Sequence, residues 1–408
     1  MTATIATLQA GIKTLYPQKA IENTYFEASP TFAVIEKNTE WSGSPMHIAL
    51  ALGGTPGSHT FANAQTVSGQ VTNVGFDITI ARDYNVIRIA TEAIRASRND
   101  MGSLMRGVKQ QADGALYTQK KTLGIDLFRS GTGSRGRISS GADTATLTLT
   151  DANDAFNFEV GDVLVSNSVD SSAGISANSV AITGIDYDAG TLTATAAWHA
   201  DFDTSDYLFR LGDASASMSG FAAWNPASAP SATPFFGLDR TTSTKLSGVR
   251  YDYTVAGDGT MERYLINLIT RACRLGGDPR LIVVSPIRWG NFENELGDKA
   301  RYDRMEGQHT DGSTASIGFD VISLMGPKGK VKVLADPYCP HNTVRGLDLK
   351  HWCFSTLGPM GWLDDDGKGQ WLRQGDADAM EARLGWYGNL YSDFPGASCT
   401  GSVSALNA

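Results

Sequence analysis

Two pairs of cysteine and histidine supply the ligand types that zinc prefers. Cys339 and His341 are separated by one residue, and so are His351 and Cys353. Paired ligands of structural zinc sites are usually separated by about two to four residues, so this spacing is unfavourable. A strand would place His351 and Cys353 on one face, which keeps a zinc site open as an alternative. Packing within a strand and a loop explains these residues more simply, and we assign no metal ligand.

A glycine-rich segment at 131–136, GTGSRG, matches the dinucleotide-binding fingerprint letter for letter. That fingerprint requires a strand before it and a helix after it, because the helix directs its first backbone amides at a pyrophosphate. Here the segment follows a predicted helix. We therefore interpret it as a flexible exit from that helix and assign no cofactor-binding residue.

Aspartates at two places offer oxygen ligands for calcium. The first place has Asp201, Asp203 and Asp206, with Asp186 and Asp188 earlier in the chain, and the second is 364–366. Neither has the roughly twelve-residue loop with a final glutamate that makes a calcium prediction specific. Turn and loop aspartates are the preferred interpretation, and calcium binding is the alternative.

No motif for covalent or phosphate chemistry is present in the sequence. The chain has neither a nucleophile elbow nor a phosphate-binding loop, and its six histidines and four cysteines are not spaced like a catalytic triad. An aromatic run at 386–391, WYGNLY, is compatible with base stacking, but an aromatic strand in a β core is the favoured interpretation. We therefore predict that the protein is not an enzyme, and we name no catalytic residue and no cofactor.

Length and composition limit the class of protein. The 408 residues are 41% hydrophobic, which allows two or three folded domains and argues against disorder. No run approaches the roughly 20 apolar residues of a membrane helix. The first twenty residues lack the basic cluster and apolar core of a signal peptide. Four cysteines in a chain of this length suit a reducing cytoplasm.

The net charge of −9 is distributed unevenly along the chain. Residues 141–213 contain eleven Asp, one Glu and one Arg, so this segment has a charge of −11 and the remainder has +2. Residues 91–137 contain nine basic and four acidic side chains, which gives +5. The contrast predicts that the two segments face different surroundings, although ordinary solvated surface explains either one alone.

Apolar spacing predicts the elements of the first half of the chain. Residues 1–40 have few core signals and suggest an arm with one short helix. Short β-like runs rich in Gly, Ser, Thr and Asn at 41–80 indicate a long two-stranded excursion. Apolar residues at three- and four-residue spacings predict a helix over 101–127, with Asp100 as its N-cap and Gly131 at its end. Five short strands follow within 141–213 and predict a small barrel or sandwich.

The second half of the chain has an α+β pattern. A Ser-, Ala- and Pro-rich connector at 214–234 precedes an amphipathic helix at 261–275 and a buried strand at 281–285. Ser285 is expected to cap a helix that has Pro286 at its first position. Strands are predicted at 319–324, 330–336 and 347–357, and a hairpin with a polar tip at 362–371.

This order of elements resembles the major capsid protein of tailed bacteriophages, which has the Hong Kong 97-type fold. Three segments support the resemblance: RACRLGGDPRLIVVSPIRWGNFENEL at 271–296, VLADPYCPHNTVRGLDLKHWCFSTLG at 333–358 and MEARLGWYGNLY at 380–391. The similarity covers most of the chain outside 141–213. Its motifs are architectural and not catalytic.

The resemblance implies an α+β fold of the phage capsid type with one insertion. Its parts would be an N-terminal arm at 1–40, an extended loop at 41–80 that overlaps a neighbouring subunit, a spine helix and peripheral domain at 81–140, an inserted small all-β domain at 141–213, a connector at 214–244, an axial domain at 245–360 and peripheral closing strands at 361–408. Within the third part, 91–129 would be the spine helix.

The resemblance also implies a function. The protein would be a structural virion protein that self-assembles in the host bacterial cytoplasm into hexamers and pentamers of an icosahedral head, which encloses double-stranded DNA. Expected partners are further copies, a separate scaffolding protein, portal and decoration proteins, and DNA bound without sequence preference, but no membrane. A separate scaffolding protein is implied because the short arm leaves no room for a fused one. The basic 91–137 segment would face scaffold or DNA, and 141–213 would project outward.

Two further expectations follow. Some members of this family cross-link subunits through a lysine of the extended loop, but 41–80 contains no lysine, so we expect no isopeptide network by that route. The alternative function is a β-rich virion or cell-surface adhesion protein that uses 141–213 as its binding module. The predicted spine helix and the strand–helix units of 258–345 argue against this alternative.

Overall fold

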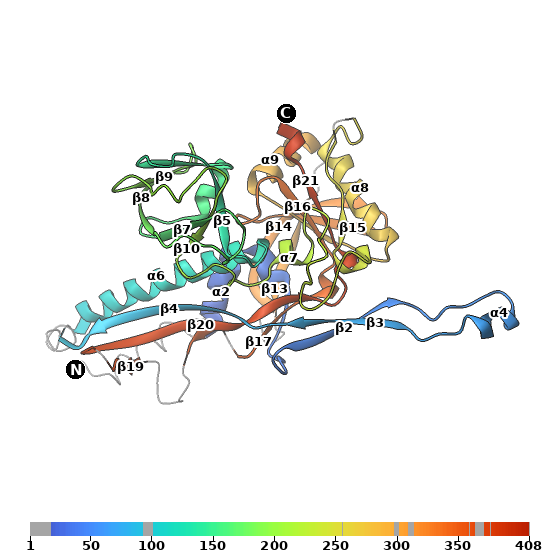
Figure 1. Cartoon of the computed structure of the whole chain (residues 1–408), viewed down its shortest axis with the longest axis horizontal. Coiled ribbons are helices and arrows are strands. Elements are labelled where there is room, and N and C mark those ends of the chain that lie inside the picture. The colour runs from blue at the N-terminus through green and yellow to red at the C-terminus, as the bar shows by residue number, and fades with distance from the viewer. Residues whose placement is uncertain are drawn as a thin grey trace.

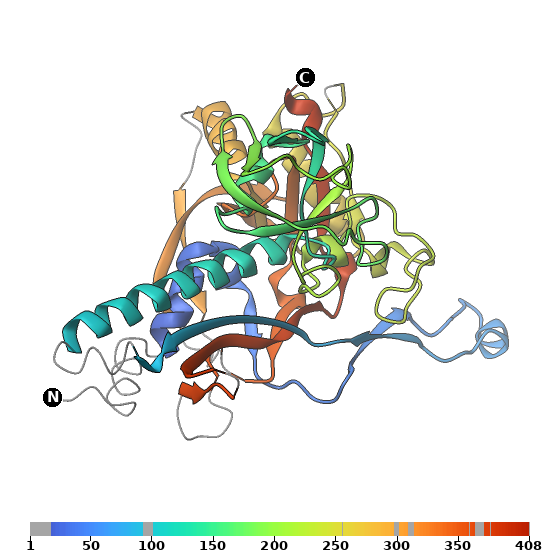
Figure 2. The same cartoon turned by 60° about the vertical axis from the view of Figure 1, so that its left-hand side comes forward.

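The computed structural model describes residues 18–92, 101–254, 256–297, 302–308, 314–358, 360–363, 371–375 and 377–407. A long helix lies between a small β-barrel and a paired β-ribbon, and a seven-stranded sheet with two helices packs at one end (Figure 1). A two-stranded hairpin projects away from this body (Figures 1 and 2).

The long helix is α6 (Met101–Phe128). Its buried apolar residues recur every three or four positions, as predicted: Val108, Ala112, Ala115, Leu116, Leu123 and Leu127. Gly124 admits a close neighbour, because a Cβ atom there would lie 2.2 Å from the ring of Tyr338. The predicted N-cap, Asp100, lies outside the described residues.

The paired ribbon consists of β4 (Ala81–Ala90) and β20 (Ala379–Ser392), which are antiparallel in unbroken register from 81 opposite 388 to 90 opposite 379. The other edge of β20 pairs in turn with β17 (Trp352–Thr356), β18 (Gly361–Trp362) and β19 (Trp371–Arg373). β1 (Glu36–Asn38) is parallel to β17 and completes a six-stranded sheet.

Two predictions in this region are wrong. The hairpin predicted at 362–371 does not form between β18 and β19, because both pair with β20, whose 14 residues offer a long edge. The single strand predicted at 347–357 is also divided. β16 (Thr343–Leu347) belongs to the seven-stranded sheet, and a short turn of 3-10 helix (Leu349–His351) leads to β17 in the other sheet. Asp348 holds this turn, since its buried carboxylate accepts a hydrogen bond from the backbone of Asp278 at 2.9 Å.

The N-terminal region contributes more to the core than its sequence predicts. It contains α2 (Gln18–Ala28) and α3 (Pro30–Val34) before β1, where one short helix was expected. Its apolar residues Ile21, Tyr25, Phe26, Phe32 and Ile35 are at most 2% exposed. These elements are so short that their buried residues form no sustained periodicity, which explains the weak signal.

The projecting hairpin consists of β2 (Met46–Gly53) and β3 (Thr72–Ile78), with α4 (Phe61–Thr66) near its tip. The two strands form a separate two-stranded sheet, in agreement with the excursion predicted at 41–80. α4 has no buried residue, whereas Phe76 and Ile78 at the root are fully buried.

The barrel closes six strands in the order β10-β5-β6-β9-β8-β7. They are β5 (Ser134–Ser140), β6 (Thr146–Leu149), β7 (Val163–Asn167), β8 (Val180–Asp186), β9 (Thr191–Ala194) and β10 (Tyr207–Arg210). Trp198, Phe202, Phe158 and surrounding aliphatic residues form its own core. The first strand precedes the segment predicted to hold all the strands. Its sequence, SRGRISS, has one apolar residue, Ile138, and so gives little strand signal.

The seven-stranded sheet has the order β11-β21-β16-β12-β15-β14-β13. Besides β16 it contains β11 (Val249–Arg250), β21 (Cys399–Ser402), β12 (Leu281–Val284), β15 (Gly329–Ala335), β14 (Thr314–Gly326) and β13 (Tyr302–Gln308). The predicted helices and the buried strand here are confirmed. α8 (Met261–Arg274) buries its apolar face, β12 is fully buried, and Ser285 caps α9 (Pro286–Leu296) by accepting from the backbone of Arg288. β21 lies within 361–408 but pairs in this sheet.

Among the helices within the described ranges, none combines the length and apolarity that crossing a membrane requires.

Candidate functional site at the junction of helix α6 and the barrel

The proposed zinc ligands do not form one site. Cys339 is buried after β15, and the nearest of its weak hydrogen-bond acceptors is the carbonyl oxygen of Thr343 at 3.6 Å. His351 lies in the turn before β17 and contacts Asp393 at 2.8 Å, so it does not share a strand face with Cys353. Burial raises the pKa of Cys353 to about 11 and opposes the thiolate that zinc binds. Across the described residues, no three His, Cys, Asp or Glu side chains gather where they would hold a metal ion.

The glycine-rich segment leads from α6 into strand β5, where the dinucleotide fingerprint needs a helix. Gly131 and Gly133 have φ angles of +83° and +88°, which favour glycine. A Cβ atom at Gly133 would lie 2.3 Å from the carbonyl oxygen of Asp213. These glycines therefore allow the chain segment that leads into the barrel to lie close to the segment that leaves it.

The aspartates considered as calcium ligands accept hydrogen bonds within the barrel. Asp186 accepts hydrogen bonds from the backbones of Asp188 and Ala189, both at 3.0 Å. Asp201 accepts from the side chains of Ser176 and Asn178, both at 2.8 Å. Asp206 accepts from the backbone of Asp203 at 3.3 Å. These aspartates therefore have hydrogen-bond donors of the barrel as partners, while 364–366 lies outside the described residues.

The aromatic run of 386–391 is part of β20, and its first residue confirms the interpretation as a core strand. Trp386 is 1% exposed and packs edge-on against Phe354, with ring centroids 5.4 Å apart.

The basic and acidic segments, which were predicted to face different surroundings, contact each other through opposite charges at the junction of α6 and the barrel. Lys121 lies 2.5 Å from the carboxylate of Glu159, which also accepts from the hydroxyl of Tyr117 at 3.0 Å. Beyond the end of the helix, Arg129 donates to Asp154 at 2.5 Å. Local pairs of this kind depend on the fold, so segment charges alone do not predict them.

Burial opposes the charged state on both sides of this contact. It lowers the pKa of Lys121, while the bond to Glu159 acts in the opposite direction. It raises the pKa of Asp154, while Arg129 opposes the shift. Each charge is therefore held in place by its partner across the contact.

We expect the Glu159→Gln substitution to loosen the barrel from α6. It removes the charge that pairs with the mostly buried Lys121, and the expected cost is about 1–3 kcal/mol. Hydrogen exchange should become faster in 115–122 and 156–162. Asp188→Asn removes an exposed carboxylate elsewhere on the barrel and should leave exchange in these segments unchanged. Unchanged exchange in Glu159→Gln would show that the pair does not hold the barrel.

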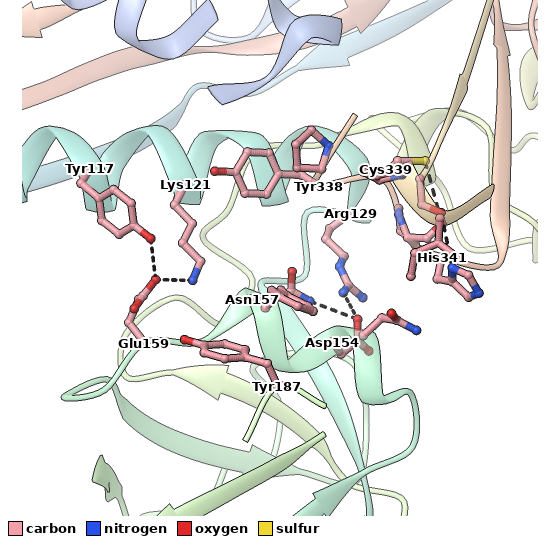
Figure 3. A pocket seen from close by; sticks show the side chains of 17 residues that line it. Tyr117, Lys121, Arg129, Asp154, Asn157, Glu159, Tyr187, Tyr338, Cys339 and His341 are labelled. Atoms are coloured by element: carbon pink, nitrogen blue, oxygen red, sulfur yellow. Dashed lines mark hydrogen bonds and ion pairs between the residues drawn. The ribbon is translucent and has the colours of Figure 1, made fainter. Parts of the chain in front are cut away.

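A pocket of about 480 Å³ lies between α6, the barrel, the start of α9 and the loop after β15 (Figure 3). Phe156 and Tyr187 of the barrel stack with ring centroids 5.0 Å apart and line one side. Ser285 and His341 lie at another side, with Oγ and Nδ1 3.4 Å apart. The Ser285 hydroxyl already caps α9, which makes a packing role the simplest explanation of this pair. The lining residues come from separated segments, so no local sequence pattern indicates this pocket.

A second, polar cavity of about 570 Å³ lies where β4, α6 and the exit of the barrel meet. Asp83 and Asp126 line it, together with Arg210 and Asp213, whose side chains are bonded at 2.8 Å. Burial raises the pKa of Asp83 to about 6 and that of Asp126 to about 7. Arg135 and Arg210 act in the opposite direction on both carboxyl groups. This cluster joins the hairpin root, the long helix and the barrel.

Comparison with known proteins bears on the fold. No family model and no curated protein match the sequence. A chain of the capsid asymmetric unit of cyanophage A-1(L) matches with a TM-score of 0.50 and 12% identity, over 93% of this chain and 91% of that one. A chain of Mycobacterium phage Ogopogo gives 0.44 and 8%, over 92% of both chains. A chain of the capsid of Myoviridae phage XM1 gives 0.42 and 8%, over 92% and 90%.

The cyanophage match spans nearly the whole of both chains, so this protein has the mixed helix-and-sheet fold of a phage capsid chain. The resemblance indicated by the sequence is confirmed at the level of the fold.

Proposed function

We propose that this chain is a major capsid protein, which assembles into hexamers and pentamers of an icosahedral shell around double-stranded DNA. The observation that carries the proposal is the projecting hairpin on a capsid-type fold. Residues 48–76 contain no Asp, Glu, Lys or Arg, and Phe61 near the tip is 78% exposed. A hairpin that lacks charged side chains over 48–76 and exposes an apolar side chain near its tip fits against a partner surface, and a second copy of the chain supplies one.

The segments take the following roles in this proposal. Residues 1–40 form an N-terminal arm, whose described part packs into the core of its own subunit, and 41–80 overlap a neighbouring subunit. Residues 81–140 and 361–408 contribute the peripheral domain, 214–244 form a connector, and 245–360 form an axial domain that meets its copies at capsomer centres. Residues 141–213 form an inserted domain. The barrel has a hydrophobic core of its own, which supports this assignment. Because strand β5 is part of the barrel, we take the domain to begin at Ser134 and not at residue 141. Its charge of −11 favours the outer surface, because packaged DNA would repel it.

The remaining parts of the proposal concern partners and location. Assembly takes place in the cytoplasm of a bacterial host with a separate scaffolding protein, and the finished head contains a portal protein. Function resides in the interfaces between subunits, with no enzymatic step. Contacts with DNA are independent of sequence.

The test is expression of the full chain with and without the products of its neighbouring genes, followed by negative-stain microscopy. Shells or capsomers are expected. Phe61→Asp places a charge on the exposed tip, so the subunit should fold while assembly fails. Soluble monomers under every condition would contradict the proposal, and monomers that bind a glycan would support the adhesion alternative.

Mature particles are expected to contain no covalent network formed through the hairpin. A lysine side chain is required for an isopeptide bond of this kind, and 41–80 has none. Denaturing gels should therefore show the capsid protein at the mass of a single chain. A ladder of covalent multimers that maps to this hairpin would contradict the prediction.

A further inference from the structure

One face of the β4–β20 ribbon is exposed and rich in arginine. The opposite face is covered by α6, since Asn85 donates to the carbonyl oxygen of Ala115 at 3.3 Å and Ile87 and Ile89 are buried. Alternation along the paired strands then places a second set of residues on the free side. We call this set the ribbon face: Arg82, Tyr84, Val86 and Arg88 of β4, with Glu381, Arg383 and Tyr387 of β20.

Positive charge predominates on the ribbon face. The three arginines face one acidic residue, Glu381, which is 7% exposed. Arg383 lies 2.5 Å and Arg88 3.8 Å from its carboxylate, yet their side chains remain 43% and 64% exposed. Their guanidinium groups are thus oriented by Glu381 and still accessible to a partner. Tyr84 and Tyr387 pack edge-on between the arginine positions, with centroids 5.7 Å apart.

The opposite side of the molecule has the opposite charge. The barrel lies on the far side of α6 from the ribbon (Figure 1), and most of it belongs to the segment with a charge of −11. The basic residues Lys121, Arg129 and Arg135 at this end of α6 pair with Glu159, Asp154 and Asp213. These three basic side chains therefore form ion pairs within the same chain, although 91–137 was expected to face scaffold or DNA. On the ribbon face, the acidic side chain of the set, Glu381, pairs with Arg383 and Arg88 but leaves both side chains partly exposed.

A polyanion with regularly spaced charges fits this surface. Arg82 and Arg88 are six residues apart on an extended strand, a separation of roughly 20 Å. Duplex DNA presents a phosphate charge about every 1.7 Å along its axis, so several phosphates lie within that span. Arginine side chains on a strand surface can contact phosphate oxygens without entering a groove, and phosphate contacts carry no direct information about base sequence.

We propose that the ribbon face contacts the phosphate backbone of the packaged double-stranded DNA, without sequence preference. The proposal rests on the proposed function as a shell around DNA. It also orients the subunit, with the ribbon toward the lumen and the barrel toward the exterior.

The first test measures binding of a short duplex to the full-length protein by fluorescence anisotropy at several salt concentrations. The triple variant Arg82→Ala, Arg88→Ala, Arg383→Ala should bind at least about tenfold more weakly at low salt. The slope of log affinity against log salt should become shallower by about 2–3. A triple replacement of the same arginines by lysine should retain most of the binding, because it preserves the charge.

A matched control removes three exposed positive charges elsewhere: Arg263→Ala, Arg274→Ala, Lys350→Ala. This control variant should retain most of the affinity for the duplex and most of the slope of log affinity against log salt. An equal loss in both triple variants would show that only net charge matters and would overturn the proposal. An unchanged slope of log affinity against log salt in the ribbon-face variant would also overturn the proposal.

The second test separates this proposal from the proposed function. In a cryo-electron microscopy map of DNA-filled particles, the ribbon face should be directed at the DNA layer. Shells with the ribbon on the exterior would overturn the proposal and leave the capsid function intact. Failure of the wild-type chain to form any shell under all the conditions above would overturn both.

Discussion

Replacement of Trp224 by alanine is expected to destabilise the protein by about 3–5 kcal/mol and to prevent shell formation. Trp224 is fully buried, and its indole nitrogen donates to the carbonyl oxygen of Leu390 at 3.0 Å. Its ring packs edge-on against Phe76 at the root of the hairpin, with centroids 5.0 Å apart, and against Phe235 at 5.1 Å. The substitution therefore creates a cavity where the hairpin joins the body. Urea unfolding and negative-stain microscopy measure the two effects.

Trp198→Ala is the matched control, because it removes the same side chain from the core of the barrel. Both variants should lose stability, but only Trp224→Ala should accelerate hydrogen exchange in 46–53 and 72–78. Equal acceleration of these strands in the two variants would show that Trp224 has no special role at the hairpin root. Wild-type stability in Trp224→Ala would contradict the packing argument itself.

Asp126→Asn is expected to stabilise the protein above neutral pH and to have little effect near pH 4. Asp126 is 6% exposed, and burial raises its pKa to about 7. The folded protein thus binds a proton that the unfolded chain releases at about pH 4. The stability linked to this carboxyl group is complete below that pH and is lost as the pH rises toward 7. Asparagine resembles the protonated form and avoids the loss.

The measurement is the free energy of unfolding in urea from pH 4 to pH 8 for both proteins. The difference between Asp126→Asn and the wild type should grow with pH and reach about 2–4 kcal/mol. Taking the difference removes contributions of other carboxyl groups that titrate in both proteins. Asp188→Asn, at an exposed position, provides the control for loss of one negative charge. A difference that does not change with pH would contradict the prediction.

Local patterns predicted the elements that have a long apolar face of their own. α8 and α6 were found by periodicity, and β12 by its run of four buried aliphatic residues. The cap at Ser285 followed from residue type and from the proline after it. In each case the signal lies within one element, so it does not depend on the partner.

Patterns failed where the partner decides the structure. β18 and β19 pair with β20 and not with each other, and β5 joins the barrel although its sequence has a single apolar residue. α2 and α3 are too short to show a period, yet they bury Tyr25, Phe26 and Phe32. The pockets beside α6 collect residues from distant segments and have no local signature.

The sequence by itself indicated a capsid fold through the order of the elements, and its cysteine, histidine, aspartate and glycine patterns lacked the spacing or context of a specific metal or nucleotide motif. It also located the acidic charge in 141–213 and the basic charge in 91–137. Only the tertiary structure decided how these charges are used. Lys121 and Arg129 pair with the barrel, whereas Arg82, Arg88 and Arg383 lie on the same face of the ribbon. The physical reason is that ion pairs and surface patches depend on distances in space, which strand register and helix packing establish between residues far apart in the chain.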